Sequence, residues 1–403
     1  MTAPVTVLGL GMSPADLTPA ARERLAAADL LAGGRRLLDY FPEHPAEKVV
    51  LGRQVAATLR ELAARLGTRR LVILASGDPN FYGVGPLAVE IFGPERVEIL
   101  PNLTAVQVAA ARLKVAWQEA RVVSLHGRGA QDLGRALSLA RKLFIYTDPE
   151  NTPAVIAREL LARGLGEARM AVLENLGQPE ERLGWYTPAE AAGRAFADLN
   201  VVYVERPQAP AALHLGLPEE ELAHEAGLVT KREVRAVALA LLRLLPGQTL
   251  WDVGAGSGSV GLEAGLAAPG LTVYAVERRP ERLAQIAANR DRFGAVWLLP
   301  ILGEAPEALA TLPDPDRVFV GGGGRDLAGI LTAAARRLKP GGRLVVAATL
   351  LSSLETARHV LEQEGLGPEV VQMQVSRSRP LAGDTYLQAA NPVWLLAGGR
   401  EEG

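Results

Sequence analysis

The stretch LWDVGAGSGSVGLEAG, residues 250–265, decides the fold of the second half of this 403-residue chain. It begins as an apolar strand, turns at Gly254 and takes on helical character near Val260. Between strand and helix lie three glycines, Gly254, Gly256 and Gly258. Residues without a Cβ allow a tight turn, and they let backbone N–H groups approach a ligand at a helix N-terminus. We therefore predict a nucleoside-binding loop here, with a purely structural glycine turn as the alternative.

A second apolar run supports this prediction. LTVYAVE, residues 271–277, ends in Glu277, about 20 residues after the glycine loop, where dinucleotide-type folds carry the carboxylate that holds a ribose hydroxyl. Asp252, two residues before the first glycine, suits a ligand with an ammonium group and would repel a pyrophosphate. A strand, a glycine loop, a helix and a second strand with a terminal acid, in that order, favour a nucleoside ligand over a structural turn.

The pattern D-x-G-x-G-x-G, then V-x-x-V-E, then a helix that closes in NRDRFG at residues 289–294, resembles the class I S-adenosylmethionine-dependent methyltransferases. The resemblance implies a Rossmann-like, doubly wound sheet with S-adenosylmethionine at the glycine loop. The cofactor-binding residues that it implies are Thr230, Asp252, Gly254, Ala255, Gly256, Ser257, Gly258, Glu277, Gly303 and Glu304. Thr230 and Glu233 also match a Thr-x-x-Glu capping box, which predicts that a helix begins at this point.

Composition excludes several other classes of protein. A net charge of -2 gives no electrostatic basis for binding RNA or DNA. No apolar run reaches a membrane-spanning length and the first residues lack the plan of a signal peptide, so we expect no membrane partner and a cytoplasmic location. Without cysteine there is no disulfide or thiolate nucleophile, and the five histidines fall in no metal-ligand spacing, so we expect no metal.

The first half of the chain predicts a further α/β region. Three apolar strands, at residues 5–8, 71–75 and 97–100, run into the polar loops GLGM, SGDPN and PNLT. The last of these loops leads into a helix that begins near Thr104. In an open α/β sheet the carboxyl ends of parallel strands form the edge at which ligands bind. We therefore expect these three loops to meet at a ligand site.

This half resembles the tetrapyrrole methylase family over about residues 3–205. The resemblance is carried by VLGLGMSPADLT, SGDPNFYG, PNLTAVQ and ENLGQPEERL, although GLGM replaces the commoner G-x-G-P-G. It implies two α/β subdomains with S-adenosylmethionine in the cleft between them. The cofactor-binding residues that it implies are Gly9, Gly11, Ser76, Gly77, Asp78 and Thr104. Asp78 is also a candidate catalytic carboxylate, the alternative being a turn residue, and the sequence assigns no other catalytic residue.

The second half resembles the decarboxylating precorrin methyltransferases over about residues 217–396, including the PGG turn of KPGGRLVVAATL. The two resemblances in this order are those of the bifunctional C5,15-methyltransferase (decarboxylating) family of cobalamin biosynthesis. They imply methylation of a precorrin at carbon 5 by the first half, and methylation at carbon 15 with loss of the ring C acetate carboxyl by the second. We place the first domain at residues 1–208, a proline-rich linker at 209–216 and the second domain at 217–403.

The precorrin macrocycle suggests which residues bind it. A run of glycines after a strand, Gly321, Gly322 and Gly323, would let a broad, rigid substrate lie against the cofactor, with a flexible turn as the alternative. Many substrate carboxylates favour arginine at the rim, since guanidinium pairs with carboxylate in a bidentate manner. The candidates are Arg325, Arg377 and Arg379, each of which could equally be a solvated surface residue.

Two other functions stay open at this point. One is an RNA- or protein-modifying methyltransferase, against which the near-neutral charge argues. The other makes one half a non-catalytic scaffold or S-adenosylmethionine sensor, against which the intact glycine loop and Glu277 argue for the second half. We expect one cofactor site per domain and a homo-oligomer.

Overall fold

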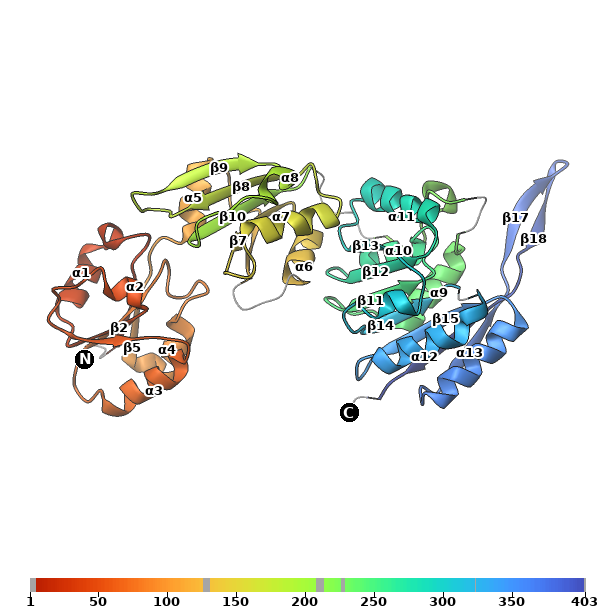
Figure 1. Cartoon of the computed structure of the whole chain (residues 1–403). Coiled ribbons are helices and arrows are strands. Elements are labelled where there is room, and N and C mark those ends of the chain that lie inside the picture. Colours follow the sequence, from red (N-terminus) through yellow and green to blue (C-terminus); the bar gives the residue numbers. More distant parts are fainter. Residues whose placement is uncertain (1–4, 126–130, 208–213, 226–228, 323, 402–403) are drawn as a thin grey trace.

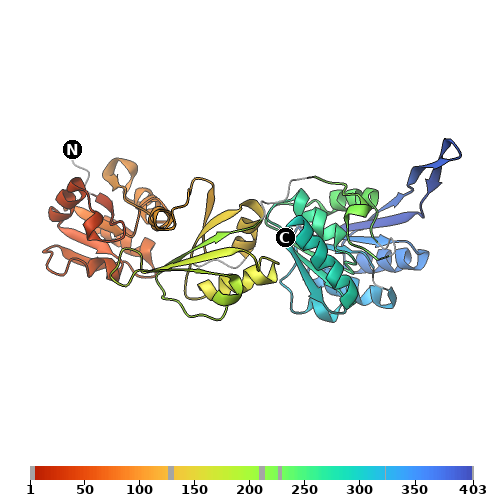
Figure 2. The same ribbon diagram turned by 90° about the horizontal axis from the view of Figure 1, so that it is seen from above.

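The computed structural model describes residues 5–125, 131–207, 214–225, 229–322 and 324–401. These residues form three α/β units, each built on its own sheet, and a two-stranded hairpin. In Figure 1 the units lie in a row, with the N-terminal unit at one end and the hairpin at the other, and the view from above agrees (Figure 2). The predicted α/β fold class is confirmed.

The first unit is a parallel sheet with strand order β3-β2-β4-β1-β5 and helices on both faces. Alternate strand residues face opposite sides, so Val5 and Val7 pack with α3 and α4, while Leu8 packs with α1 and α2. The elements are β1 (Val5–Gly9), α1 (Pro19–Ala26), β2 (Leu30–Gly33), α2 (Arg35–Leu38), β3 (Glu47–Val50), α3 (Val55–Arg65), β4 (Leu71–Ala75), α4 (Gly85–Phe92) and β5 (Val97–Leu100), with short 3-10 turns η1 (Pro14–Asp16) and η2 (Pro94–Arg96).

The second unit is a mixed sheet with strand order β6-β7-β10-β8-β9, in which only the β6–β7 pairing is parallel. Helix α5, which follows the first sheet, packs its Val106 and Ala109 on one face beside Phe144 and Tyr203. The elements are α5 (Ala105–Leu113), β6 (Ala120–Ser124), α6 (Gln131–Leu139), β7 (Lys142–Tyr146), α7 (Pro153–Ala162), β8 (Arg169–Glu174), β9 (Arg182–Tyr186), α8 (Pro188–Ala191) and β10 (Asn200–Glu205).

The third unit is a seven-stranded sheet of order β13-β12-β11-β14-β15-β19-β16, parallel except where β19 pairs with β15 and β16. Helices α9 to α11 cover one face and α12 and α13 the other. The elements are η3 (Glu219–Glu221), α9 (Arg232–Leu242), β11 (Thr249–Val253), α10 (Ser259–Ala267), β12 (Thr272–Glu277), α11 (Pro280–Phe293), β13 (Leu298–Leu302), η4 (Glu307–Leu309), β14 (Arg317–Val320), η5 (Gly324–Asp326), α12 (Leu327–Arg337), β15 (Arg343–Ala348), α13 (Leu351–Gln363), β16 (Glu369–Met373) and β19 (Val393–Gly399). This is the Rossmann-like arrangement that the glycine loop predicts.

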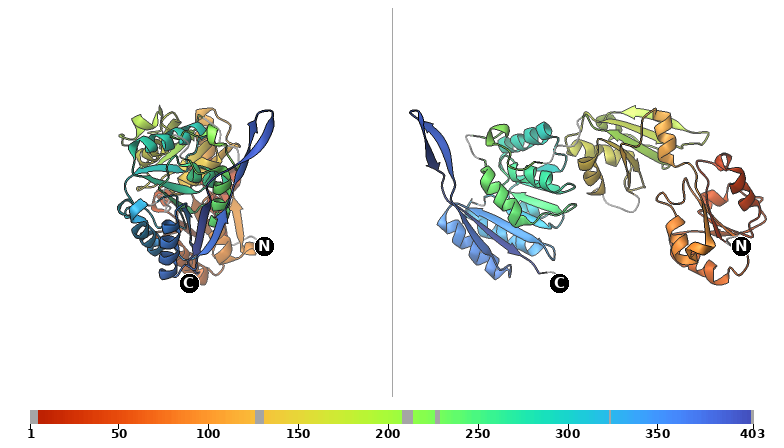
Figure 3. Two further views of the ribbon diagram at one scale, coloured as in Figure 1. Left: turned by 90° about the vertical axis from the view of Figure 1, so that its right-hand side faces the viewer. Right: turned by 180° about the vertical axis from the view of Figure 1, so that it is seen from behind.

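A hairpin of β17 (Ser376–Leu381) and β18 (Asp384–Ala389) extends away from the third unit, as the two further views in Figure 3 make clear. At the other end of this unit, one hydrophobic cluster continues from α6 and α7 of the second unit into α9, α10 and α11. The second and third units therefore share a packed core.

One local prediction is wrong. Helix α9 begins after Lys231 with no side-chain cap, so Thr230 and Glu233 do not form a capping box. The carboxylate of Glu233 instead binds Arg377 from the hairpin. A charged partner from a distant segment competes here with the local cap.

Candidate functional site

The three polar loops of the first unit meet as the sequence predicts, because β4, β1 and β5 are neighbours in the sheet. Gly77 donates its backbone N–H to the carbonyl of Gly11 over 3.1 Å. A Cβ at Gly9 would lie 2.6 Å from the Gly77 carbonyl oxygen, so only glycine fits there. The side chain of Asn102 ties the third loop to the carbonyl of Gly9 over 2.9 Å.

A cavity of about 660 Å³ opens beside these loops, between the first and second units. The first sheet contributes the turns after β1 and β4, together with α2. The second unit contributes the ends of β7 and β8 and the start of β10. The lining residues are Leu10, Gly11, Met12, Arg36, Leu37, Tyr40, Ser76, Ala105, Tyr146, Leu173, Leu176, Leu199, Asn200 and Val201. A cleft between two subdomains is the position that the tetrapyrrole methylase resemblance implies.

Two of the six predicted cofactor residues, Gly11 and Ser76, line this cavity. Gly9 and Gly77 shape the loops behind it, and Thr104 caps α5 by accepting from Gln107. Asp78 Oδ1 accepts from the backbone N–H of Asn80 over 2.8 Å. That bond is the turn contact of the alternative interpretation, and a catalytic role for Asp78 stays a prediction.

Sequence reasoning missed the parts of the cavity wall that come from α2 and from the second sheet. Burial raises the pKa of Tyr146, in this wall, to about 12, so the phenol is neutral at physiological pH. The short strand before α2 and the mixed pairing of the second sheet carry no motif. One signal in the sequence could have indicated these wall residues. An apolar strand that ends in polar residues, as at Tyr146 and Thr147, is typical of a strand end at the edge of a sheet.

The glycine loop of the third unit has the predicted backbone. Gly254, Gly256 and Gly258 have φ of 69°, 60° and 74°, a region that side chains strain. A Cβ at Gly254 would lie 2.7 Å from the carbonyl oxygen of Gly322, in the glycine run after β14. The two glycine segments therefore touch through their backbones.

Glu277 ends β12 beside this loop and is largely buried. Its Oε2 accepts from the N–H of Gly256 over 2.9 Å, and its Oε1 accepts from the N–H groups of Arg278 and Arg279 over 3.1 Å each. A carboxylate offers about four acceptor positions, so at least one stays available to a ribose hydroxyl.

A cavity of about 1360 Å³ lies at this edge of the sheet. It brings together six predicted residues: the cofactor candidates Gly254, Glu277, Gly303 and Glu304, and the substrate candidates Gly321 and Gly322. Lining residues that the sequence did not indicate are Val253, Val276, Arg278, Arg282, Ala305, Gly324, Asp326 and Ile330. The wall combines the accessible backbone of its glycines and the carboxylate of Glu277 with apolar side chains. Such a combination suits an adenosyl ligand.

Other predicted cofactor residues lie elsewhere. Asp252 is buried, and its Oδ2 accepts from the N–H of Gly261 over 2.9 Å. Ala255 and Gly258 belong to the loop without lining the cavity, and the buried Ser257 hydroxyl has no hydrogen-bond partner among the described residues. Thr230 contributes its carbonyl oxygen to the guanidinium of Arg235. A cofactor role for these residues stays a prediction.

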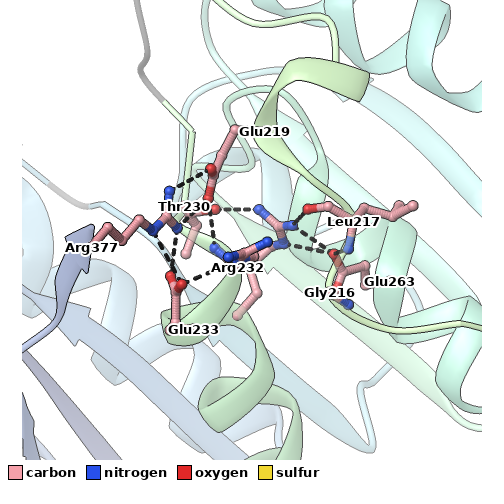
Figure 4. Close-up of polar contacts among 9 residues, drawn as sticks. Gly216, Leu217, Glu219, Thr230, Arg232, Glu233, Glu263 and Arg377 are labelled. Carbon is pink, nitrogen blue, oxygen red and sulfur yellow. Dashed lines mark hydrogen bonds and ion pairs between the residues drawn. The ribbon is translucent and has the colours of Figure 1, made fainter. Parts of the chain in front are cut away.

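The substrate candidate Arg377 is held by two carboxylates (Figure 4). It forms a bidentate pair with Glu219, at 2.8 and 2.9 Å, and binds both carboxylate oxygens of Glu233. These bonds lower the pKa of Glu219 and of Glu233 to about 2 and raise that of Arg377. Arg379 donates to Gln388 over 3.3 Å and lines a separate cavity of about 780 Å³ with Arg377. Gly323 and the side chain of Arg325 lie outside the described residues.

Next to this clamp, a buried ion pair fixes the start of the third unit (Figure 4). Arg235 and Glu263 meet at 2.6 Å with both side chains fully buried. Glu263 also accepts from the N–H groups of Gly216 and Leu217. The segment that enters the third unit is thereby joined to α9 and α10.

The residues that the structure describes include neither a metal-binding cluster nor a membrane-spanning helix. No group of three or more His, Asp or Glu side chains could hold a metal ion. No helix has both the length and the apolar character needed to cross a bilayer.

Comparisons with known proteins match both halves of the chain. A family model described as tetrapyrrole (corrin/porphyrin) methylases matches residues 4–192, and one described as precorrin methyltransferase domain matches residues 221–398. The precorrin-6Y C(5,15)-methyltransferase [decarboxylating] of a Sinorhizobium species is 35% identical over 400 residues, covering 96% of this chain and 94% of the relative.

Two shorter relatives each match about half of the chain. The cobalt-precorrin-7 C(5)-methyltransferase of Salmonella typhimurium is 40% identical over 50% of this chain and 98% of its own length. The probable cobalt-precorrin-6B C(15)-methyltransferase (decarboxylating) of Pyrobaculum calidifontis is 42% identical over 45% of this chain and 94% of its own length.

Proposed function

The chain belongs to the precorrin-6Y C(5,15)-methyltransferase (decarboxylating) family, and from this we propose that its two cavities are the two methylation sites. The protein is an S-adenosylmethionine-dependent enzyme of cobalamin biosynthesis. It methylates a precorrin at carbons 5 and 15 and removes the carboxyl of the ring C acetate side chain, which converts precorrin-6B to precorrin-8X.

The observation that carries the division of labour is the presence of two separate cavities, each at the carboxyl edge of a parallel sheet. The relatives support the same division, since separate proteins named for the C(5) and the C(15) reaction each match one half of the chain's length. We assign carbon 5 to the cavity beside Gly11, and carbon 15 with decarboxylation to the cavity beside Glu277. The corresponding domains are residues 1–208 and 217–403, joined by 209–216.

We assign one S-adenosylmethionine to each cavity. In the first, Gly11 and Ser76 would hold it against the walls from α2 and the second sheet. In the second, Glu277 would accept from its ribose, with Gly254, Gly303 and Glu304 around the adenosyl group. S-adenosylmethionine supplies an electrophilic methyl group to an electron-rich carbon of the macrocycle.

The share of this chain's own residues in the reaction is placement and exclusion of water. Enamine-like carbons of the macrocycle are themselves nucleophilic, so no protein nucleophile is required. The backbone of Gly321 and Gly322 offers a flat surface on which the macrocycle can lie beside the cofactor. Decarboxylation needs a protonated conjugated ring as an electron sink, which calls for a general acid.

The relatives named above all act on precorrins or cobalt-precorrins, which supports a precorrin over RNA or protein as the target. We also propose a homo-oligomer, supported by large apolar side chains exposed on the hairpin, Leu381, Tyr386 and Leu387. The cytoplasmic location stays a prediction.

Mass spectrometry of the products tests the division. The whole chain should add two methyl groups to precorrin-6B and release one carbon dioxide. Glu277→Ala should leave precorrin-6B without the carbon-15 methyl and without decarboxylation. It should still transfer the carbon-5 methyl to the product that Gly11→Ala makes from precorrin-6B, since the relative named for the C(5) reaction acts on cobalt-precorrin-7 and the one named for the C(15) reaction on cobalt-precorrin-6B. Gly11→Ala, whose Cβ would lie 2.8 Å from Asp16, should show the opposite loss. If Glu277→Ala leaves that product unmethylated, if Gly11→Ala adds both methyl groups, or if the whole chain leaves freshly made precorrin-6B unchanged, the assignment is wrong.

A further inference from the structure

A second hollow adjoins the cofactor cavity of the first half. It is open to solvent, has a volume of about 880 Å³ and is lined by Arg35, Arg36, Asp39, Tyr40, Gln178 and Leu199. Arg36, Tyr40 and Leu199 also line the cofactor cavity, so the two spaces are adjacent and share part of their walls. A substrate in the outer hollow would therefore lie next to a cofactor in the inner one. We call this outer space the arginine hollow.

Local structure explains why two arginines stand at this position. Strand β2 ends at Gly33, and the single-turn helix α2 follows directly. Leu37 and Leu38 of that turn are buried in the core, which leaves Arg35 and Arg36 exposed to solvent. Because β2 runs parallel to β4, α2 lies at the same sheet edge as the loop that contains Ser76.

The guanidinium group of neither arginine has an ion pair or a hydrogen bond within the part of the chain that the structure describes. Other arginines of the same unit are paired, such as Arg24 with Glu98 at 2.7 Å and Arg70 with Asp29 at 3.2 Å. Two adjacent guanidinium groups without carboxylate partners, at the entrance to a cofactor cavity, are suited to binding an anionic ligand.

The rest of the hollow is held in place across the two units. The side-chain amide of Gln178, after β8, donates to the hydroxyl of Tyr40 over 2.9 Å and to the carbonyl of Met12 over 3.2 Å. Leu199, 40% exposed, adds an apolar surface from the second unit. A rigid floor, an apolar patch and a cationic rim match a flat macrocycle that carries carboxylates on its periphery.

We propose that Arg35 and Arg36 bind peripheral carboxylates of the precorrin and position it for methylation at carbon 5. This rests on the proposed function of the first cavity. Asp39 lies in the same wall and lowers the net positive charge of the hollow. The arginines therefore act through direct, bidentate contact with the carboxylates more than through a long-range electric field. They are specificity-determining residues, since a tetrapyrrole without carboxylates at these positions would lose the contacts.

The test measures kcat and KM for transfer of the carbon-5 methyl by mass spectrometry, with saturating S-adenosylmethionine and increasing concentrations of the precorrin that is already methylated at carbon 15 and decarboxylated. Arg35→Ala and Arg36→Ala should each raise KM about tenfold, with kcat little changed, because a charge-assisted contact contributes about 1.5 kcal/mol at a partly exposed site. The double variant should raise KM further, and the KM of the wild type should rise with salt while that of the double variant rises less. Arg35→Lys should restore part of the loss, since it keeps the charge without the bidentate geometry.

Arg96→Ala is the matched control. Arg96 is exposed, has no ion pair among the described residues and precedes β5, at the opposite edge of the same sheet. Its KM should equal that of the wild type. Cofactor binding to the first cavity, measured by calorimetry in a Glu277→Ala background, should stay within about twofold for Arg35→Ala.

Three results would overturn the proposal. If the double variant has the KM of the wild type, the two arginines do not contribute to substrate binding. A fall in kcat or cofactor affinity with unchanged KM makes their role structural. A wild-type chain that methylates carbon 15 but never carbon 5 contradicts the proposed function of the first half, and the arginine proposal with it.

Discussion

Arg163 and Val296 join the two halves of the protein: Nη1 of Arg163, at the end of α7, donates to the carbonyl of Val296 in the third unit over 3.0 Å. Arg163 is buried, and burial lowers its pKa despite the carboxylate of Glu159 nearby. Arg206 makes a similar contact, donating to the carbonyl of Gly294 over 3.0 Å. Two buried cations that cap backbone carbonyls of another unit indicate a fixed orientation between the two halves.

The first prediction follows from this contact. Arg163→Ala leaves the Val296 carbonyl buried without its donor and opens a cavity, so the free energy of unfolding should fall by about 2–3 kcal/mol. Urea titration followed by tryptophan fluorescence measures it, since Trp297 lies in the same packed region. Arg158→Ala, on the exposed side of α7 where Arg158 donates to Ala192, should cost less than about 0.5 kcal/mol. If both variants lose the same free energy of unfolding, the buried contact between Arg163 and Val296 contributes no more to stability than an exposed one.

The second prediction concerns the clamp of Arg377 on Glu219 and Glu233. Their pKa values near 2 lie below the unfolded value of about 4.3, so the clamp stabilises the fold above that pH and its contribution disappears as the pH falls toward 2. Arg377→Ala should therefore cost about 2 kcal/mol near neutral pH and markedly less near pH ~3, measured by urea unfolding.

Arg379→Ala is the control for this clamp, because Arg379 lies on the same strand and its guanidinium donates only to the amide oxygen of Gln388 among the described residues. It should change the free energy of unfolding by less than about 0.5 kcal/mol at either pH. A cost of Arg377→Ala that does not depend on pH would contradict the ion-pair explanation.

The third prediction separates two glycines of the same loop. Both Gly254 and Gly256 have positive φ, so alanine costs about 1 kcal/mol of backbone strain at each. A Cβ at Gly254 also meets Gly322, whereas a Cβ at Gly256 meets no atom within 4 Å. Gly254→Ala should therefore lose about 2 kcal/mol more free energy of unfolding than Gly256→Ala, with weaker cofactor binding in the second cavity. If both variants lose the same free energy of unfolding, the loop at Gly254 and the glycine run at Gly322 can move apart at little energetic cost.

Of the residues that line the two cavities, the sequence indicated those whose position depends on local chemistry. Gly254 and Glu277 could be identified because a tight turn and a strand-terminal acid each have a residue signature at a fixed spacing. Gly11 and Ser76 could be identified because a buried strand ends just before each. The parallel sheet then brings such strand ends together without further information.

What the sequence could not provide is pairing between distant segments. Glu219 and Arg377 are 158 residues apart, and nothing in either neighbourhood indicates the other. Strand β2 has four residues and β3 is largely exposed, so neither has the periodicity of a core strand, and α2 with Tyr40 was missed together with them. The Thr230 and Glu233 pattern is a valid local signal that a tertiary ion pair overrides.

The last prediction concerns Asp252, whose side chain is buried beneath the glycine loop. Burial raises its pKa to about 7; the N–H of Gly261 opposes this, and the charge of Glu277 adds to it. The folded value lies above the unfolded value of about 3.9, so between these two pH values the folded state binds more protons than the unfolded state. The contribution of Asp252 to stability must then fall as the pH rises from about 4 to about 7. Asp252→Asn keeps an oxygen to accept from Gly261 but cannot ionise.

The difference in free energy of unfolding between Asp252→Asn and the wild type should therefore shift in favour of the variant by about 2–4 kcal/mol over that range, and level off above it. Urea unfolding of both proteins at several pH values measures the difference, from which the titration of all other groups cancels. The hydrogen bond from the N–H of Gly261 to Asp252 also fixes the start of α10. A variant that loses this bond should therefore have a lower free energy of unfolding by the same amount at every pH. A constant difference would thus show that Asp252 is ionised throughout and acts only as a hydrogen-bond acceptor.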